Sequence, residues 1–369
     1  MTTIYFWQQM VTPHMASLAL TLSQNKHDIV YVAETSLSTD RAELGWEVPE
    51  MGKISVHYAK NDQAAKSILF SAPANSIHIC QGIRNNGIVK YVQKLLKKNK
   101  LRQWVIIETI NDNGFFGLIK RALYRFLILL YRKDIEIILA IGWKTPGWLV
   151  RHGFDSKKIF PFTYFLSQSN EFTFNSKDTF KPFRFIFVGG LLPGKKLDLL
   201  ILALSKIKDH SFELVIIGDG PCKKSWQQYA DKLIPNRSYW KGIVKMSDVP
   251  KNLSDANCLV LPSIHDGWGA VVSESMIVGT PAICSDACGV AEVVKASGFG
   301  GVFKSTNVSD LLYQLKSVIE AGPLNIKDQT KLSVWSNKIT SDAGAKYLTN
   351  IINFANGSNN QPIPPWNEK

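Results

Sequence analysis

Residues 258–286, CLVLPSIHDGWGAVVSESMIVGTPAICSD, predict a strand, a glycine-containing loop, a helix, a short turn and a second strand. The carboxylates of Asp266 and Glu274 bracket the expected start of the helix. A helix start presents unpaired backbone N–H groups and the positive end of a dipole, which suit a phosphate. If the helix begins near Gly269, Glu274 lies about 7 Å along its axis, which matches the separation between a diphosphate and the ribose of one nucleotide. The alternative interpretation is an ordinary βαβ unit with surface acids.

Strand-like apolar runs alternate with helix-like runs along the whole chain, which indicates parallel sheets built from βαβ units. At 369 residues the chain exceeds one hydrophobic core, so we expect two doubly wound, Rossmann-like α/β domains. The expected strands are residues 3–8, 27–34, 54–58, 76–82, 104–109 and 134–142 in the first half, and 184–188, 213–217, 238–240, 258–261, 281–284 and 300–305 in the second.

The polar segment 169–182 has no clear period and is the expected linker between the domains. It separates an N-terminal domain of residues 1–168 from a C-terminal domain of residues 183–340. Residues 341–369 predict a helix and a tail, and we expect this helix to pack back on the N-terminal domain. Because doubly wound sheets bind ligands at the carboxyl ends of their strands, we expect the site in a cleft between the two domains.

Composition indicates a globular protein, with 45% hydrophobic and 20% charged residues. The five cysteines are odd in number and contain no CxxC pair, so we expect a reducing compartment without disulfides or structural zinc. Residues 1–10 lack the basic and long apolar regions of a signal peptide, and no apolar run approaches 18 residues. These features predict a cytoplasmic protein.

The net charge of +13 is concentrated in residues 84–133, which hold 12 basic and 2 acidic residues. Such a concentration predicts a basic surface that meets an anionic partner. Within it, residues 118–133 interleave Lys120, Arg121 and Arg125 with aromatic and leucine residues, as in helices that lie on anionic bilayers. The alternative is a helix that covers the sheet while its cations are solvated. Nothing resembles a nucleic-acid recognition helix or stacking motif, so we expect no nucleic-acid partner.

A second glycine motif, GGLLPGKK (189–196), follows an expected strand and precedes an expected helix. Its spacing matches a P-loop except at Lys196, where Ser or Thr would hold Mg²⁺. A phosphate-facing loop with Lys195 as its cation is therefore favoured over an ATPase motif. The turn IIGDGP (216–221) ends the next strand, and its Gly218 either admits a ligand or makes a tight turn.

Together these motifs resemble the retaining glycosyltransferases of family 4, the group 1 glycosyl transferases, which have the GT-B fold. That family's donor site has an acid, seven intervening residues and a glutamate, matched here by Asp266, GWGAVVS and Glu274. A Gly-x-Pro turn into a strand follows in VGTPAICSD, and the VGG strand end, the lysine, IIGDGP and LPS occur in family order. The resemblance covers residues 184–300 well and the N-terminal half by architecture.

The resemblance implies that Glu274 binds the nucleotide ribose, Asp266 contacts the donor sugar and Lys195 neutralises the leaving diphosphate. The implied donor-binding set is Gly189, Gly190, Lys195, Gly218, Asp266, Gly267, Trp268, Gly269, Ala270 and Glu274. Three positions depart from the family pattern. Asp266 stands where Glu is usual, Gly190 where an arginine is frequent, and VTPHMA (11–16) where many members have a glycine-rich loop.

The implied enzyme is a hexosyltransferase that moves a sugar from a nucleotide-diphosphate sugar to a hydroxyl of a glycan or lipid-linked glycan. The resemblance implies retention by front-face attack, no metal or other cofactor, and an acceptor held by the N-terminal domain. We expect a role in polysaccharide biosynthesis (capsule, O-antigen or exopolysaccharide) and a peripheral position on the inner face of the cell membrane. The alternatives are a nucleotide-sugar epimerase of the same fold, a P-loop-like ATP-dependent phosphotransferase and a basic nucleic-acid-binding protein. The sequence does not reveal the donor's base and sugar, the acceptor or the linkage.

Overall fold

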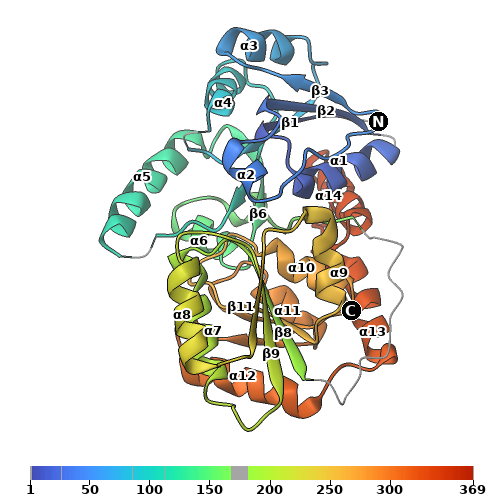
Figure 1. The fold of residues 1–369 in the computed structure, drawn as a ribbon. Coiled ribbons are helices and arrows are strands. Elements are labelled where there is room, and N and C mark those ends of the chain that lie inside the picture. Colours follow the sequence, from blue (N-terminus) through green and yellow to red (C-terminus); the bar gives the residue numbers. More distant parts are fainter. Residues whose placement is uncertain (1, 26, 85, 113, 168–181, 369) are drawn as a thin grey trace. The chain divides into compact units, whose positions relative to one another are not determined.

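The computed structural model describes residues 2–25, 27–84, 86–112, 114–167 and 182–368 (Figure 1). The chain divides into two compact units. Unit 1 comprises Met1–Thr39, Glu47–Ser167 and Ile339–Lys369, and unit 2 comprises Asp40–Trp46 and Gln168–Lys338. All but the last residue of the expected linker 169–182 lies outside the described residues.

Unit 1 contains a seven-stranded parallel sheet in the order β3-β2-β1-β4-β5-β6-β7. Its strands are β1 (Thr3–Met10), β2 (Asp28–Thr35), β3 (Ser55–Tyr58), β4 (Ile77–Gln81), β5 (Gln103–Glu108), β6 (Ile135–Ile141) and β7 (Ile159–Phe162). The central strands are almost wholly buried, as expected for a parallel sheet covered on both faces. The chain reverses direction across the sheet between β1 and β4, which is where such folds bind ligands.

Helices flank this sheet, and the last helix of the chain is one of them. The helices of unit 1 are α1 (Pro13–Gln24), α3 (Asp62–Phe70), α4 (Ile88–Lys98), α5 (Phe115–Tyr131), α6 (Thr145–Arg151) and α14 (Ser341–Ala355). Helix α14 packs against α1, where His27 Nε2 lies 3.0 Å from Thr349 Oγ1. Gly344 lets α14 approach the segment after β7, because a Cβ at this position would lie 2.3 Å from the ring of Phe165.

Unit 2 contains a six-stranded parallel sheet in the order β10-β9-β8-β11-β12-β13. Its strands are β8 (Phe183–Val188), β9 (Phe212–Ile217), β10 (Ser238–Gly242), β11 (Cys258–Leu261), β12 (Ala282–Ser285) and β13 (Gly301–Phe303). Here the strand order reverses between β8 and β11. Two parallel α/β sheets with a reversal in each are the doubly wound architecture that the sequence predicts.

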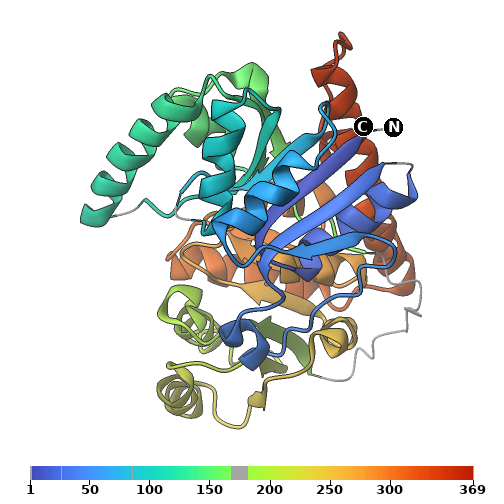
Figure 2. The ribbon, with the colours of Figure 1, turned by 90° about the horizontal axis from the view of Figure 1, so that it is seen from above.

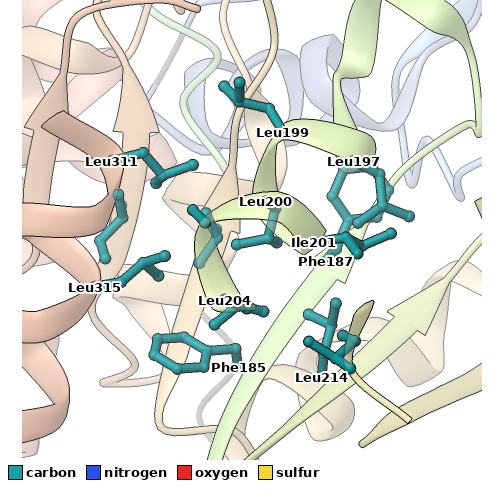
Figure 3. Packing of buried hydrophobic residues seen from close by; sticks show 14 of the residues in the cluster. Phe185, Phe187, Leu197, Leu199, Leu200, Ile201, Leu204, Leu214, Leu311 and Leu315 are labelled. Carbon is teal, nitrogen blue, oxygen red and sulfur yellow. The ribbon is translucent and has the colours of Figure 1, made fainter. Parts of the chain in front are cut away.

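Helices on both faces bury the sheet of unit 2. They are α7 (Leu197–Leu204), α8 (Lys223–Leu233), α9 (Val249–Ser254), α10 (Ala270–Ile277), α11 (Ala291–Ser297), α12 (Val308–Ala321) and α13 (Ile326–Ser336). On one face, leucines of α7 lie between Leu311 and Leu315 of α12 and the strand residues Phe185 and Phe187 (Figure 3). On the other face, α10 contacts β11, α9 and α13. The core therefore holds α10 rigidly at the carboxyl end of β11.

The segment Asp40–Trp46, which includes most of α2 (Thr39–Glu43), belongs to unit 2. Gly45 has a left-handed φ of +80°, and a Cβ there would lie 2.7 Å from the carbonyl oxygen of Val244. The carbonyl oxygen of Gly45 accepts a hydrogen bond of 3.2 Å from the amide of Met246. The sequence-based boundaries assign this segment to the N-terminal domain, whereas its contacts group it with unit 2.

Among the described residues, no helix has both the length and the apolar character needed to cross a bilayer.

Candidate functional site

Helix α10 begins at Ala270, which confirms the start predicted near Gly269. Gly269 is the N-cap residue in a left-handed conformation, with φ of +96°. A Cβ at Gly269 would lie 2.9 Å from Leu261 Cδ2 and 3.4 Å from Val290 Cγ1, so this tight turn requires glycine. Within the described chain no side chain caps the helix. The amide of Val272 donates to Gly269 O at 2.9 Å, so the amides of Ala270 and Val271 are the ones available to an anion.

Backbone hydrogen bonds fix the loop that precedes α10. The amide of Asp266 donates to Ala287 O at 3.2 Å, and Asp266 O accepts from Gly289 N at 3.0 Å. The buried indole of Trp268 donates from Nε1 to Ser273 Oγ at 3.0 Å, in the first turn of α10. The side chain of Trp268 thus connects the loop to the helix. Gly267 and Ala270, which are also predicted to bind the donor, lie in the same loop and at the helix start.

Lys195 and Asp266, which are 71 positions apart in the sequence, form an ion pair of 2.6 Å between Nζ and Oδ2. Both side chains are partly buried. Lys195 follows β8 and Asp266 follows β11, the two neighbouring strands at the reversal of the sheet. A backbone hydrogen bond of 2.9 Å from Ile264 N to Gly194 O joins the same two loops. The structure therefore brings the two motifs together at the expected ligand-binding edge.

The two consecutive lysines of the first loop have different partners. Lys195 ends a 3-10 turn (Pro193–Lys195) and faces Asp266, whereas Lys196 precedes α7 with φ of +53° and pairs with Asp198 at 3.0 Å. A nucleotide-hydrolysing P-loop would place a hydroxyl for Mg²⁺ at the second position. Here that position carries an ion-paired cation. The loop's chemistry is therefore that of an anion site with one lysine.

Gly189 and Gly218 bring the loops after β8 and β9 into contact. A Cβ at Gly218, where φ is +130°, would lie 2.1 Å from Gly189 O. This close approach joins backbone to backbone, so Gly218 shapes the wall of the site. Gly190 is different, because a Cβ there would meet Leu192 at an ordinary 3.7 Å and its φ is not in the left-handed region. A larger residue would fit at Gly190.

Glu274 lies in the second turn of α10 and is partly buried. In the part of the chain that the structure describes, its carboxyl group has no hydrogen-bond or ion-pair partner. Burial raises the pKa of Glu274 from 4.5 to about 7, because the ionised form loses water without gaining a partner. A carboxylate in this state accepts hydrogen bonds from a ligand at little cost in competing interactions.

The predicted membrane-facing cations Lys120, Arg121 and Arg125 lie on α5 in unit 1, whereas the residues described above belong to unit 2. Lys120 Nζ donates to Asn111 O at 3.0 Å. Arg121 donates to Asp112 O at 2.6 Å and forms an ion pair of 3.6 Å with the Asp112 carboxylate. Arg125 is exposed. Arg121 is thus engaged in fastening a loop rather than presented to a partner.

The sequence interpretation missed a polar cluster at the carboxyl edge of the unit 1 sheet. The Tyr164 hydroxyl donates to Glu108 Oε1 at the end of β5, and the Tyr164 ring lies 5.2 Å from that of His14. His14 follows β1, one of the strands at the reversal of this sheet. Three separated residues carry no motif, so only their position after different strands could have suggested the cluster.

The fold is that of the GT-B glycosyltransferases. A lipopolysaccharide outer core galactosyltransferase, WaaB, in its apo form superposes with a TM-score of 0.71 over 96% of this chain and 99% of its own, at 17% identity. HepE of Anabaena in complex with UDP superposes with a TM-score of 0.74 over 96% of this chain and 100% of its own, at 13% identity. At these identities the likeness shows the fold alone.

Sequence comparison points to the same class through unit 2. Residues 169–332 match the family model for glycosyl transferases group 1. An uncharacterized glycosyltransferase of Methanocaldococcus jannaschii is 31% identical over 112 residues, which are 30% of this chain and 29% of that protein. The sulfoquinovosyl transferase SQD2 of Arabidopsis thaliana is 25% identical over 171 residues, or 45% of this chain and 32% of that protein. The matches therefore span about a third of these relatives.

Proposed function

We propose that this protein is a retaining glycosyltransferase that moves a sugar from a nucleotide-diphosphate sugar to a hydroxyl of a glycan or lipid-linked glycan. The observation that carries the proposal is the Lys195–Asp266 ion pair beside the uncapped start of α10. It places a cation, a carboxylate and free amides at one strand edge. The group 1 family match to the same unit supports this assignment, as does the UDP in the HepE structure.

Lys195 serves as the cation for the donor diphosphate. With no anion present, Lys195 is neutralised by Asp266 at 2.6 Å. An arriving diphosphate carries more charge than one carboxylate and draws the ammonium group toward itself. A partly exposed ion pair contributes about 1 kcal/mol or less, so this exchange costs little. Asp266 is then released to accept hydrogen bonds from the donor's sugar hydroxyls.

Glu274 serves as the ribose ligand. Two ribose hydroxyls can donate to its two carboxylate oxygens, which supplies the partners that the free protein lacks. The ionised form is required, because a protonated carboxyl accepts less well and itself becomes a donor. Donor binding should therefore lower the pKa of Glu274 from its value of about 7 in the free protein.

In the transfer step the bond between the sugar's anomeric carbon and the leaving phosphate oxygen breaks, and the acceptor oxygen bonds to the same face of the sugar. Negative charge develops on the departing diphosphate, where Lys195 and the first amides of α10 stabilise it more in the transition state than in the ground state. A phosphate oxygen of the donor takes the acceptor's proton. On this proposal Lys195 and the helix amides neutralise the leaving diphosphate, as a divalent cation does in metal-dependent transferases, and no cofactor takes part.

The acceptor is assigned to unit 1, at the edge formed by His14, Glu108 and Tyr164. Hydroxyl and carboxylate groups there suit the hydroxyls of a glycan. We assign the protein to polysaccharide biosynthesis and to a peripheral position on the inner face of the cell membrane.

A thermal-shift screen against UDP-, GDP- and dTDP-sugars tests the proposal. A ligand that binds the folded state raises the melting temperature by mass action, so one nucleotide class should raise it more than the others. The rise should be clearly smaller in Lys195→Ala and unchanged in Lys331→Ala, a matched control whose lysine pairs with Asp328 at 2.7 Å on α13. No response to any nucleotide sugar, or an equal response in both variants, would contradict the donor assignment.

A further inference from the structure

Helix α5 has two apolar faces. On the inner face, Ile128 and Tyr131 are buried and Tyr124 and Leu127 pack against the same core. The outward side carries further apolar side chains, the α5 stripe, with exposed fractions in parentheses: Phe116 (74%), Leu118 (58%), Ile119 (57%), Leu123 (36%), Phe126 (63%), Leu129 (52%) and Leu130 (43%). At 100° per residue these side chains form one continuous side of the helix that is about 160° wide.

The α5 stripe is unusual for a surface helix, which ordinarily turns polar residues outward. In both views α5 extends away from the strands of unit 1 (Figures 1 and 2). Single exposed apolar residues need no explanation, but a continuous row marks a binding surface. The α5 stripe therefore has the character of a surface that a partner covers.

Charge around the α5 stripe selects the partner. Helix α5 contains no acidic residue, and Lys120 and Arg125 lie on opposite sides of the stripe at 100° per residue. The two nearest acids in sequence are both paired. Asp112 forms an ion pair with Arg121 and accepts from Trp148 Nε1 at 3.0 Å, and Asp134 forms an ion pair of 3.0 Å with Lys97. The rim of the α5 stripe is thus cationic.

We infer that the α5 stripe inserts into the headgroup and acyl boundary of an anionic bilayer, with α5 parallel to the membrane surface. A second copy of this chain would bring the same cations against each other, whereas anionic phospholipid complements them. The inference rests on the proposed peripheral attachment and gives it an apolar mechanism, in which Arg121 has no part.

Sedimentation of the full chain with vesicles tests this inference without donor or acceptor. The probes are vesicles of phosphatidylcholine with phosphatidylglycerol and vesicles of phosphatidylcholine alone. The full chain should bind the anionic vesicles. Binding of Ile119→Ser/Phe126→Ser should fall by about tenfold or more, since each large apolar side chain contributes substantially when buried. Phe70→Ser is the control, because Phe70 is 51% exposed on α3 in the same unit and lies outside the α5 stripe.

The outcomes separate the alternatives. Unchanged vesicle binding in Ile119→Ser/Phe126→Ser, or no binding by the unaltered chain, would overturn the inference. A dimer by light scattering that the double substitution dissociates would also overturn it, and would assign the stripe to a second copy. Both positions are exposed, so the variant should keep the circular-dichroism spectrum and the nucleotide-sugar thermal shift of the unaltered chain. If the unaltered chain itself shows no nucleotide-sugar thermal shift, the donor site is contradicted and the vesicle result still tests the α5 stripe.

Discussion

At the residue scale, the environment of Glu274 departs from what folding alone would select. Its carboxyl group is desolvated without a partner, which raises its pKa to about 7. A proton bound more tightly in the folded than in the unfolded state stabilises the fold at low pH, and that contribution is lost as pH rises through about 7. Glu274 therefore costs stability at neutral and alkaline pH, as is common for residues retained for binding.

Glu274→Gln should show this cost directly. The variant should melt near the unaltered protein at pH 5 and above it at pH 8, where removing the unpaired charge relieves about 3 kcal/mol. Donor affinity should fall strongly at pH 8, because the amide cannot accept two ribose hydrogen bonds with the strength of a carboxylate. Melting curves with and without donor at both pH values measure these effects. Glu320→Gln, at an exposed position of α12, should change neither quantity, and equal pH profiles for both variants would contradict the role of Glu274.

Gly190 offers a gain of function. Family resemblance implies an arginine at this position, and the nearest obstacle to a Cβ is Leu192 at 3.7 Å. Gly190→Arg should supply a second cation to the diphosphate and tighten donor binding by about tenfold, the effect of one charged hydrogen bond. Gly190→Gln, which adds similar bulk without charge, is the matched control. Donor titration calorimetry in which both substitutions weaken binding equally would show that the position does not face the diphosphate.

At the element scale, the start of α10 depends on Gly269. An alanine there must adopt a left-handed conformation and approach Leu261 at 2.9 Å, so Gly269→Ala should destabilise the protein by about 2 kcal/mol or more. It should also weaken donor binding, because the helix's first amides move. Gly298→Ala provides the comparison, since Gly298 has φ of +72° with open space around it. Urea unfolding should show a smaller loss for Gly298→Ala, with donor affinity retained. Equal donor affinity in both variants would contradict the claim that the start of α10 binds the donor.

The elements that the sequence predicts well are those whose signals are local. The boundary of α10 follows from two glycines before an apolar run, and β11 from an uninterrupted apolar stretch. Strand β7 (Ile159–Phe162) is missing from the expected strands, and it contains Pro161. Proline lacks an amide hydrogen and is tolerated at a sheet edge, which is where β7 lies.

At the scale of the whole molecule, features that depend on distant contacts could not be derived from spacing. The resemblance assigns Lys195 and Asp266 to one ligand, but their ion pair depends on how two loops fold beside β8 and β11. Asp40–Trp46 groups with unit 2, and Gly45 lies against Val244 there. No local sequence pattern predicts this contact. The sequence shows that α5 is rich in apolar residues. Which of them are exposed can be said only once the structure shows which of them pack against the core.

The central claim is that Lys195 stabilises the charge that leaves during sugar transfer. The most direct measurement is the single-turnover transfer rate of Lys195→Ala at saturating donor and acceptor, beside Lys331→Ala. The account predicts a rate lower by on the order of a hundredfold or more for Lys195→Ala, as for loss of one transition-state donor, and an unchanged rate for Lys331→Ala. Equal rates in the two variants would contradict it.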